Sequence, residues 1–167
     1  SCNGASDGSI DVTVGGGTGV YTYSWSNGAD SEDLADLSAG TYSVTVADEN
    51  GCSVSIEVEI TETDAMTISE THSDFTGYGV SCNGASDGSI DVTVGGGTGV
   101  YTYSWSNGAA GSFVSEFTQE TISNLPAGIY SVVVTDENGC SVSIEVEITE
   151  SESITISENH SDYTGYG

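Results

Sequence analysis

Carboxylates are the most abundant ionisable groups in this chain. The 167 residues include 26 Asp or Glu, two His and no Lys or Arg, which gives a formal net charge of -26 at pH 7. Paired carboxylates can hydrolyse glycosidic bonds, and Glu57 with Glu59 forms such a pair on one predicted strand. The pair recurs at Glu145 and Glu147 without any sign of a cleft. We therefore interpret these side chains as a solvated face that also discourages sheet edges from pairing.

The segments His72-Ser73-Asp74 and His160-Ser161-Asp162 contain the residue types of a hydrolytic triad. Consecutive side chains on a strand point to opposite faces, so three neighbours cannot adopt triad geometry. We therefore expect no catalytic residue and predict that the protein is not an enzyme. Asn159-His160-Ser161 also fits the N-glycosylation pattern, but Thr71 stands at the corresponding place in the first half, so the match is interpreted as accidental.

Several turn segments carry oxygen ligands of the kind that Ca²⁺ prefers. The candidate ligands are Asp7, Asp48, Glu49, Asn50, Asp87, Asp136, Glu137 and Asn138. Asp and Asn also favour turns for conformational reasons, and neither the EF-hand spacing nor a calcium-binding nonapeptide repeat is present. Turn formation is the preferred interpretation, so we expect no required cofactor and keep Ca²⁺ as a hypothesis.

The absence of basic residues limits the partners that this chain can bind. Nothing is available to neutralise phosphates, which excludes nucleic acid as a natural ligand, and anionic membrane surfaces repel the chain. No apolar run approaches the roughly 20 residues needed to span a bilayer, so we expect no direct membrane insertion. Mutual repulsion favours an extended arrangement, although salt screens it beyond about 8 Å.

The chain repeats itself. Residues 1–29 and 81–109 are identical, 41–62 match 129–150 with three differences, and 67–79 match 155–167. The sequence period therefore divides the chain into repeat one, 1–80, and repeat two, 81–167. A period of this length is too long for an ordinary solenoid and suits a small independent domain, so we interpret the chain as part of a longer tandem array.

Each repeat alternates apolar and polar residues with the period of β-strands. The alternating segments in the first repeat are 9–14, 21–25, 41–46, 53–60 and 66–69. Asn50-Gly51 is a hairpin signal between two of them, and each repeat has one Trp, Trp25 or Trp105, expected in the core. The pattern predicts an all-β protein of tandem immunoglobulin- or fibronectin-III-like β-sandwich domains in an extended rod.

The folding frame is expected to differ from the sequence period. Residues 66–70 read as the leading strand of the second domain, which predicts an incomplete domain over 1–64, a complete one over 65–152, and the leading strand of a next repeat over 153–167. The second repeat carries eight extra residues, centred on 111–119. They fit a tolerated loop expansion, an extra edge strand or hairpin, or a binding protrusion, and their role stays open.

An ordered set of motifs resembles the SprB-type repeat of flavobacterial gliding-motility adhesins. The motifs are "CNGASDGSIDVTV", "GVYTYSWSNGA", "NLPAGIYSVVVTDENGC" and the ending "EITE", which together cover nearly all of each period. The resemblance implies tandem immunoglobulin-like modules, type IX secretion, and an extracellular location on the outer-membrane exterior. It also implies action through the gliding machinery, contacted by other parts of the protein, and brings no catalytic residues.

The four cysteines, Cys2, Cys52, Cys82 and Cys140, suit disulfides in a surface protein. Pairing within each domain is favoured because every repeat supplies its own pair. A Greek-key sandwich would place Cys2 and Cys52 at opposite ends, however, so Cys2 with Cys140 is kept as the alternative. A zinc site is not expected, because no CxxC or Cys–His spacing is present.

We expect a structural stalk segment of a large adhesin filament, whose partners are neighbouring repeats of the same chain. The alternative is a module that itself binds polysaccharide, the substratum or another surface ligand. Tyr78 and Tyr166 could stack on sugars, but alternation places most strand tyrosines in the core. The sequence leaves the number of repeats, the ligand, calcium dependence and any bundling of chains undetermined.

Overall fold

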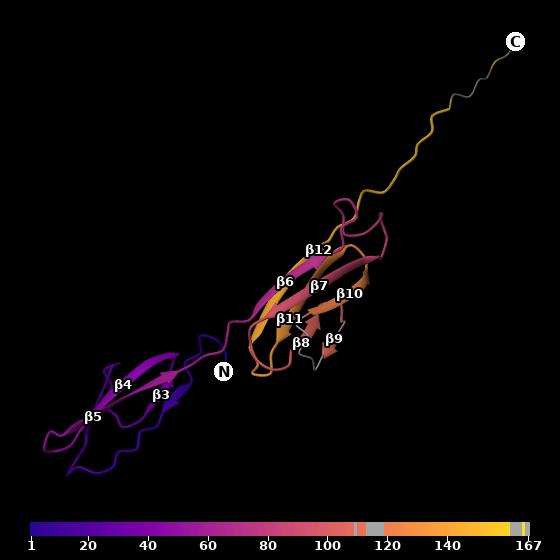
Figure 1. Cartoon of the computed structure of the whole chain (residues 1–167). Helices are drawn as coiled ribbons and strands as arrows, with labels where there is room; N and C mark the ends of the chain where they lie inside the picture. The colour runs from indigo at the N-terminus through magenta and orange to yellow at the C-terminus, as the bar shows by residue number, and fades with distance from the viewer. Residues whose placement is uncertain (109, 113–118, 161–164, 166–167) are drawn as a thin grey trace.

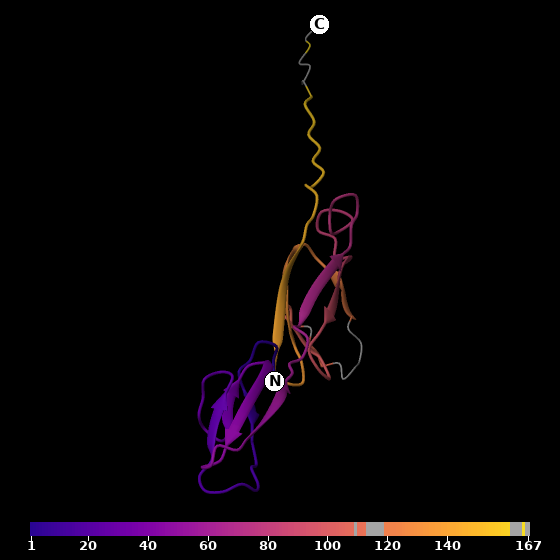
Figure 2. The ribbon, with the colours of Figure 1, turned by 60° about the vertical axis from the view of Figure 1, so that its left-hand side comes forward.

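The computed structural model describes residues 1–108, 110–112, 119–160 and 165. Throughout these residues the regular elements are antiparallel β-strands, which confirms the all-β prediction. They form two units that follow one another along the chain, as Figures 1 and 2 show. No helix in the described part could span a membrane. Most of the predicted insertion, 113–118, lies outside the described residues.

The second unit consists of two facing sheets. One has the order β10-β7-β6, and the other has the order β12-β11-β8-β9. The strands are β6 (Thr67–His72), β7 (Gly88–Gly95), β8 (Thr102–Trp105), β9 (Ala110–Ser112), β10 (Gln119–Leu125), β11 (Gly128–Thr135) and β12 (Ser141–Ile148). Alternate valines and isoleucines of β7 and β11 point between the sheets and are almost wholly buried. The apolar periodicity of the sequence therefore builds the core as predicted.

The first unit has smaller sheets. β1 (Gly8–Ile10) pairs with β3 (Leu34–Leu37), and the other sheet has the order β2-β4-β5, from Thr22–Trp25, Gly40–Ala47 and Ser53–Ile60. Its buried core residues are Ile10, Val12, Trp25, Leu34, Leu37, Val44 and Val46. Trp25 and its counterpart Trp105 are both buried, as their place in the alternating pattern predicts.

One identical sequence adopts different structure in the two units. Residues 8–15 and 88–95 both read GSIDVTVG. In the second unit all eight residues form β7, which pairs with β6 on one side and β10 on the other. In the first unit the strand has three residues and pairs with β3. Neighbouring strands, and not local propensity, therefore decide how far this segment stays in a sheet.

The inner face of the first unit is correspondingly exposed. Val54 and Ile56 of β5 are 61% and 49% exposed. Their counterparts on β12, Val142 and Ile144, pack against the core of the second unit. The difference arises because β6 lies close to β12 in the second unit, whereas the structure shows no strand at the corresponding place among the described residues of the first.

The described segment that follows β12 has the sequence of a leading strand but lies in solvent. Figures 1 and 2 show it running away from the second unit. Ile154 and Ile156 are 100% and 99% exposed. Their counterparts Met66 and Ile68 pack against the core of the second unit. The folding frame with boundaries at 64 and 152 stays a prediction, since independent folding of each part would test it.

We predict that amide hydrogens of residues 93–95 exchange at least about tenfold more slowly than those of residues 13–15. The two segments share the same sequence and flanking residues, so their intrinsic exchange rates are equal. The difference in protection reports the pairing with β6, and at Thr93 also the pairing with β10. Assigned NMR spectra are required, because peptides from the identical repeats have the same mass. Equal protection at the two places would contradict the pairing described here.

Candidate functional site

At the joint between the two units, residues that are far apart in the sequence are in contact. The joint includes a disulfide between Cys2 and Cys140, which are 138 residues apart in sequence and have Cα atoms 5.5 Å apart. Cys52 and Cys82 are exposed free thiols. The structure thus differs from the within-domain pairing favoured from the sequence and has the alternative, Cys2 with Cys140. Closing so long a loop is worth about 5 kcal/mol on a chain-entropy estimate.

The length of β5 explains why pairing within the first unit fails. Asn3, next to Cys2, donates a hydrogen bond from Nδ2 to the Thr63 carbonyl at 2.8 Å, beyond the end of β5. Cys52 precedes the start of the same eight-residue strand. A strand of that length spans about 26 Å, and a disulfide needs Cα atoms within about 7 Å. The β11–β12 hairpin of the second unit instead brings Cys140 to Cys2.

The connector between the units, residues 61–66, is held by hydrogen bonds from backbone amides. The Gly4 amide donates to Glu62 Oε2 at 2.6 Å, and the Gly97 amide of the second unit donates to the Asp64 carbonyl at 2.9 Å. Glu62 is therefore a structural acceptor at the joint. Contacts from both units to one short connector fix where the second unit begins.

A glycine is required where the connector crosses the second unit. Gly96 has φ +72°, and a Cβ added there would lie 2.0 Å from the Ala65 carbonyl oxygen. At the equivalent place in the first unit, Gly16, a Cβ would meet nothing within 4 Å. The close approach of the connector therefore explains the glycine at position 96, whereas its counterpart Gly16 lies open in the first unit.

The residues that follow β12 are held by the same kind of hydrogen bonds as the residues that follow β5. Asn83 Nδ2 donates to the Ser151 carbonyl at 2.8 Å, and the Gly84 amide donates to Glu150 Oε2 at 2.7 Å. These bonds match those of Asn3 and Gly4 with the residues after β5. The segment after β12 thus leaves the second unit along the same path that the connector takes from the first.

The hairpin that carries Cys140 is organised by one buried carboxylate. Asp136 is 6% exposed, and its Oδ1 accepts from the amides of Asn138 and Cys140 at 3.0 and 2.8 Å. Its Oδ2 accepts from the Thr98 amide at 3.0 Å. Burial acts to raise the pKa of Asp136, but these hydrogen bonds outweigh it and hold the pKa below its usual value.

Asp48 makes the same contacts in the first unit. Its carboxylate accepts from the amides of Cys52, Asn50 and Thr18. The hydrogen bond from the Cys52 amide is the main cause of its lowered pKa. Asn50 donates from Nδ2 to Thr18 Oγ1 at 2.6 Å. These residues therefore stabilise the hairpin, as the turn interpretation expects.

The remaining calcium candidates lie in similar turns. The Glu49 and Glu137 side chains lie over Gly19 and Gly99, and Asn138 bonds Thr98 as Asn50 bonds Thr18. Asp7 accepts from the Ser1 hydroxyl, and Asp87 from the Ser81 amide at 3.1 Å. Hydrogen bonds from Ser81 lower the pKa of Asp87. Among the described residues no group of three His, Cys, Asp or Glu is placed to hold a metal, and the calcium hypothesis stays untested.

The triad-like segment is not assembled as a triad in the structure. His72 Nδ1 lies 3.0 Å from Glu70 Oε2, whereas Ser73 donates to the Gly79 carbonyl at 2.5 Å. Asp74 accepts from the Gly77 amide at 2.6 Å. Each side chain thus has its own local partner. Of the second segment, His160 is described and exposed, and the serine and aspartate after it lie outside the described residues.

The other predicted surface groups stay apart from the joint. Glu57, Glu59, Glu145 and Glu147 are exposed on β5 and β12. Tyr78 is 43% exposed in the loop between β6 and β7, while Tyr166 lies outside the described residues.

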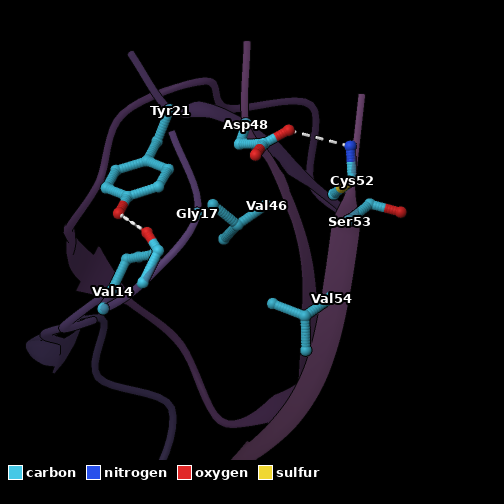
Figure 3. A pocket seen from close by; sticks show the side chains of 10 residues that line it. Val14, Gly17, Tyr21, Val46, Asp48, Cys52, Ser53 and Val54 are labelled. Atoms are coloured by element: carbon cyan, nitrogen blue, oxygen red, sulfur yellow. Dashed lines mark hydrogen bonds between the residues drawn. The ribbon is translucent and has the colours of Figure 1, made fainter. Parts of the chain in front are cut away.

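Two features escaped sequence reasoning. Glu120 on β10 is partly buried beside Tyr103 and Trp105, and burial raises its pKa, although the Trp105 indole offsets part of the effect. The first unit also has a hollow of about 180 Å³ between the glycines at 15–17 and β5. Figure 3 shows Val46 and Val54 pointing into this hollow, which Val14 also lines. A comparison of the two repeats could have indicated this hollow. Among the described residues, the first unit has no strand at the place that β6 takes in the second.

The comparison with protein families bears on both halves of the chain. Residues 1–30 and 80–110 match the family model described as SprB repeat. Each half of the chain thus contains a segment that matches the SprB repeat. Both matched segments include the asparagine and glycine that bond the residues after β5 and after β12, at 3–4 and 83–84. The comparison with curated proteins gives no match.

SprB repeats belong to cell-surface adhesins related to gliding motility, and they form a structural family, not a family of enzymes. The resemblance inferred from the motifs is therefore confirmed. A cell-surface, adhesin-associated repeat agrees with an all-β chain that contains a disulfide.

We predict that Asp136→Asn destabilises the second unit by about 1–3 kcal/mol at pH 7, because an amide nitrogen would replace one of two oxygens that accept hydrogen bonds. The folded pKa lies below the usual 3.8, so the carboxylate's contribution is complete above that value and is lost as the pH falls through the folded pKa. Urea unfolding at pH 7 and pH 3 should show the gap between wild type and variant shrinking at the lower pH. A gap independent of pH would contradict this role.

Removal of calcium should leave the melting temperature unchanged within about 1 °C, because hydrogen-bond donors already occupy the oxygens of Asp48 and Asp136. Thermal unfolding with excess chelator, compared with added CaCl₂, measures this. MgCl₂ at equal ionic strength is the control, since cations also screen the acidic surface. A rise specific to Ca²⁺ would instead support the calcium hypothesis.

Proposed function

We propose that this chain is a structural stalk segment of a large secreted bacterial adhesin filament used in surface attachment and gliding motility. In this proposal tandem immunoglobulin-like units form an extended rod on the outer-membrane exterior, exported by the type IX route. The observation that carries the proposal is the joint, where a disulfide and backbone hydrogen bonds to a short connector link successive units.

The position of the disulfide suits a part that bears load. A force applied between the ends of this chain passes from Cys2 directly to Cys140 and then along β12. Residues 3–139, which include the first unit and most of the second, lie within the closed loop and are shielded from that force. Unfolding of those residues then adds no length, which is a useful property for a stalk pulled across a surface.

We predict that Cys2→Ser lengthens the fully stretched chain by roughly 480 Å in single-molecule pulling from its two ends. The value is 138 residue steps at about 3.5 Å each. Cys82→Ser is the matched control and should leave the length unchanged, because Cys82 is a free thiol. A wild-type chain that already stretches to the length of Cys2→Ser would argue against a load-bearing joint.

The rival function is a repeat that itself binds polysaccharide or another surface ligand. The observation that favours it is the exposure of Tyr78 and Phe75, 43% and 38%, in one loop of the second unit. Exposed aromatic rings can stack on sugars. Binding to a glycan array that is lost in Tyr78→Ala would support this rival, whereas absence of binding favours the stalk.

A further inference from the structure

Asparagine followed by glycine is a recurrent, chemically labile dipeptide in this chain. Six of the eight asparagines precede a glycine, and they are Asn3, Asn27, Asn50, Asn83, Asn107 and Asn138. In such a pair the glycine nitrogen attacks the side-chain carbonyl carbon of the asparagine, because glycine carries no side chain that obstructs the approach. The product is a succinimide, and asparagine counts among the thermolabile residues of proteins. Each pair is therefore a candidate site of spontaneous modification.

The fold requires the glycines of these pairs. All six have φ between +77° and +88°, in the left-handed region that residues with a Cβ adopt only with strain. Some of the asparagines are needed as well, since Asn3 and Asn83 donate hydrogen bonds to the residues after β5 and β12. The labile pairs thus belong to the structure, and protection from the reaction has to come from their contacts.

Every glycine amide in these pairs donates a hydrogen bond, which opposes the loss of the proton that the reaction requires. Four of them donate to the backbone carbonyl three residues earlier, at distances from 2.9 to 3.1 Å. Gly4 and Gly84 donate instead to the carboxylates of Glu62 and Glu150, at 2.6 and 2.7 Å. Such a bond is roughly twice as strong as one to a neutral acceptor, and the negative charge disfavours an amide anion. These two connector carboxylates therefore protect the glycine nitrogen most strongly.

Four of the asparagine side chains are also held through their own nitrogen. Nδ2 donates to a backbone carbonyl at Asn3 and Asn83, at 2.8 Å in both places. It donates to a threonine hydroxyl at Asn50 and Asn138, at 2.6 Å in both places. The reacting atoms have to approach to about 3–3.5 Å. Each of these side chains therefore has to break a hydrogen bond before it can cyclise.

Asn27 differs from these four asparagines. Its Oδ1 accepts a hydrogen bond from the Ala29 amide at 3.1 Å, and in the described part of the chain its Nδ2 donates to no residue. The nitrogen that has to leave is therefore not held. The Ala29 amide lies at the oxygen on which negative charge develops during the attack, as the donors of an oxyanion hole do. The Gly28 amide has a neutral acceptor, the Trp25 carbonyl at 3.0 Å.

We propose that the folded chain deamidates at Asn27, and that the connector carboxylates protect Asn3 and Asn83 from the same reaction. The nitrogen of Gly28 bonds to Cγ of Asn27, and the Cγ–Nδ2 bond breaks. The amide proton passes through water to the leaving nitrogen, which departs as ammonia. Water then adds to one of the two imide carbonyls and opens the ring, leaving aspartate or isoaspartate at position 27.

The protection lies where modification would remove contacts between distant residues. At Asn3 the reaction would replace the donor to Thr63 by a carboxylate, which would face a carbonyl oxygen close to Glu62. At Asn83 it would remove the hydrogen bond to Ser151 in the same way. Among the described residues, the Asn27 side chain bonds only within its own turn. Spontaneous modification is thus directed to a turn and kept away from the joint.

Deamidation rates of the folded chain test the proposal. The chain is incubated at mildly alkaline pH and physiological temperature, then cleaved at Glu under mildly acidic conditions, in which deamidation is slow. Asn3 and Asn27 lie in one fragment, 1–32, and Asn83 lies in 71–116, so tandem mass spectrometry measures each site. We expect Asn27 to react at least about tenfold faster than the other two, which have a further hydrogen bond and a charge-assisted one to break. After reduction in urea, the three rates should converge.

Two variants test the connector carboxylates, and each is the control for the other. Glu62→Ala removes the charge-assisted acceptor and should raise the rate at Asn3 at least about fivefold, with Asn83 unchanged. Glu150→Ala should raise the rate at Asn83 and leave Asn3 unchanged. An equal rise at Asn3 and Asn27 in Glu62→Ala would indicate that the first unit has unfolded. In that case the rate at Asn83 in Glu150→Ala decides.

Three results would overturn the proposal. Equal rates at Asn3 and Asn27 in the folded chain would show that the contacts give no protection. An unchanged or lower rate at Asn3 in Glu62→Ala would show that the carboxylate has no effect or acts as a base that promotes the reaction. An equal rise at Asn3 in both variants would show that the effect is not local. The inference goes beyond the proposed stalk and does not depend on it, so the pulling result stands whichever outcome is found.

Discussion

The structure depends on one constraint, that a strand after each connector completes the sheet of the unit that follows. β6 contributes backbone hydrogen bonds to β7 and apolar side chains to the core. Where it is present, eight residues form a strand and β12 is covered; in the first unit, three residues form a strand and Val54 is exposed. Connection and folding are therefore the same event, since a unit is completed by residues that also attach it to its neighbour.

This constraint explains which parts of the fold the sequence could predict. Alternation within strands is local, so the core valines and the buried Trp25 and Trp105 were predictable from pattern. The length of β1 was not, because its sequence is identical to part of β7 and the partner alone differs. A pattern within one segment contains no information about whether a partner strand is present.

In the candidate site, too, the local turns could be predicted from the sequence, whereas the contacts between units could not. The Asp48 and Asp136 turns follow from the turn preferences of Asp and Asn, and the structure adds that their oxygens hold the hairpins that carry Cys52 and Cys140. The disulfide depends on which ends of two units meet, which residue spacing within one repeat does not contain. The role of Glu62 likewise arises at the joint, because its amide donor comes from Gly4, far away in sequence.

An acidic chain without Lys or Arg must make its joints without ion pairs to those residues. At this joint the carboxylates accept backbone amide protons instead, as Glu62 and Asp136 do, and such bonds compensate for the missing cations. The crossing at Gly96 brings main chain against main chain, where no side-chain charge intervenes. Repulsion between units then acts on their exposed faces and favours extension, while the backbone contacts and the disulfide hold the ends together. High charge and a firm joint are therefore compatible.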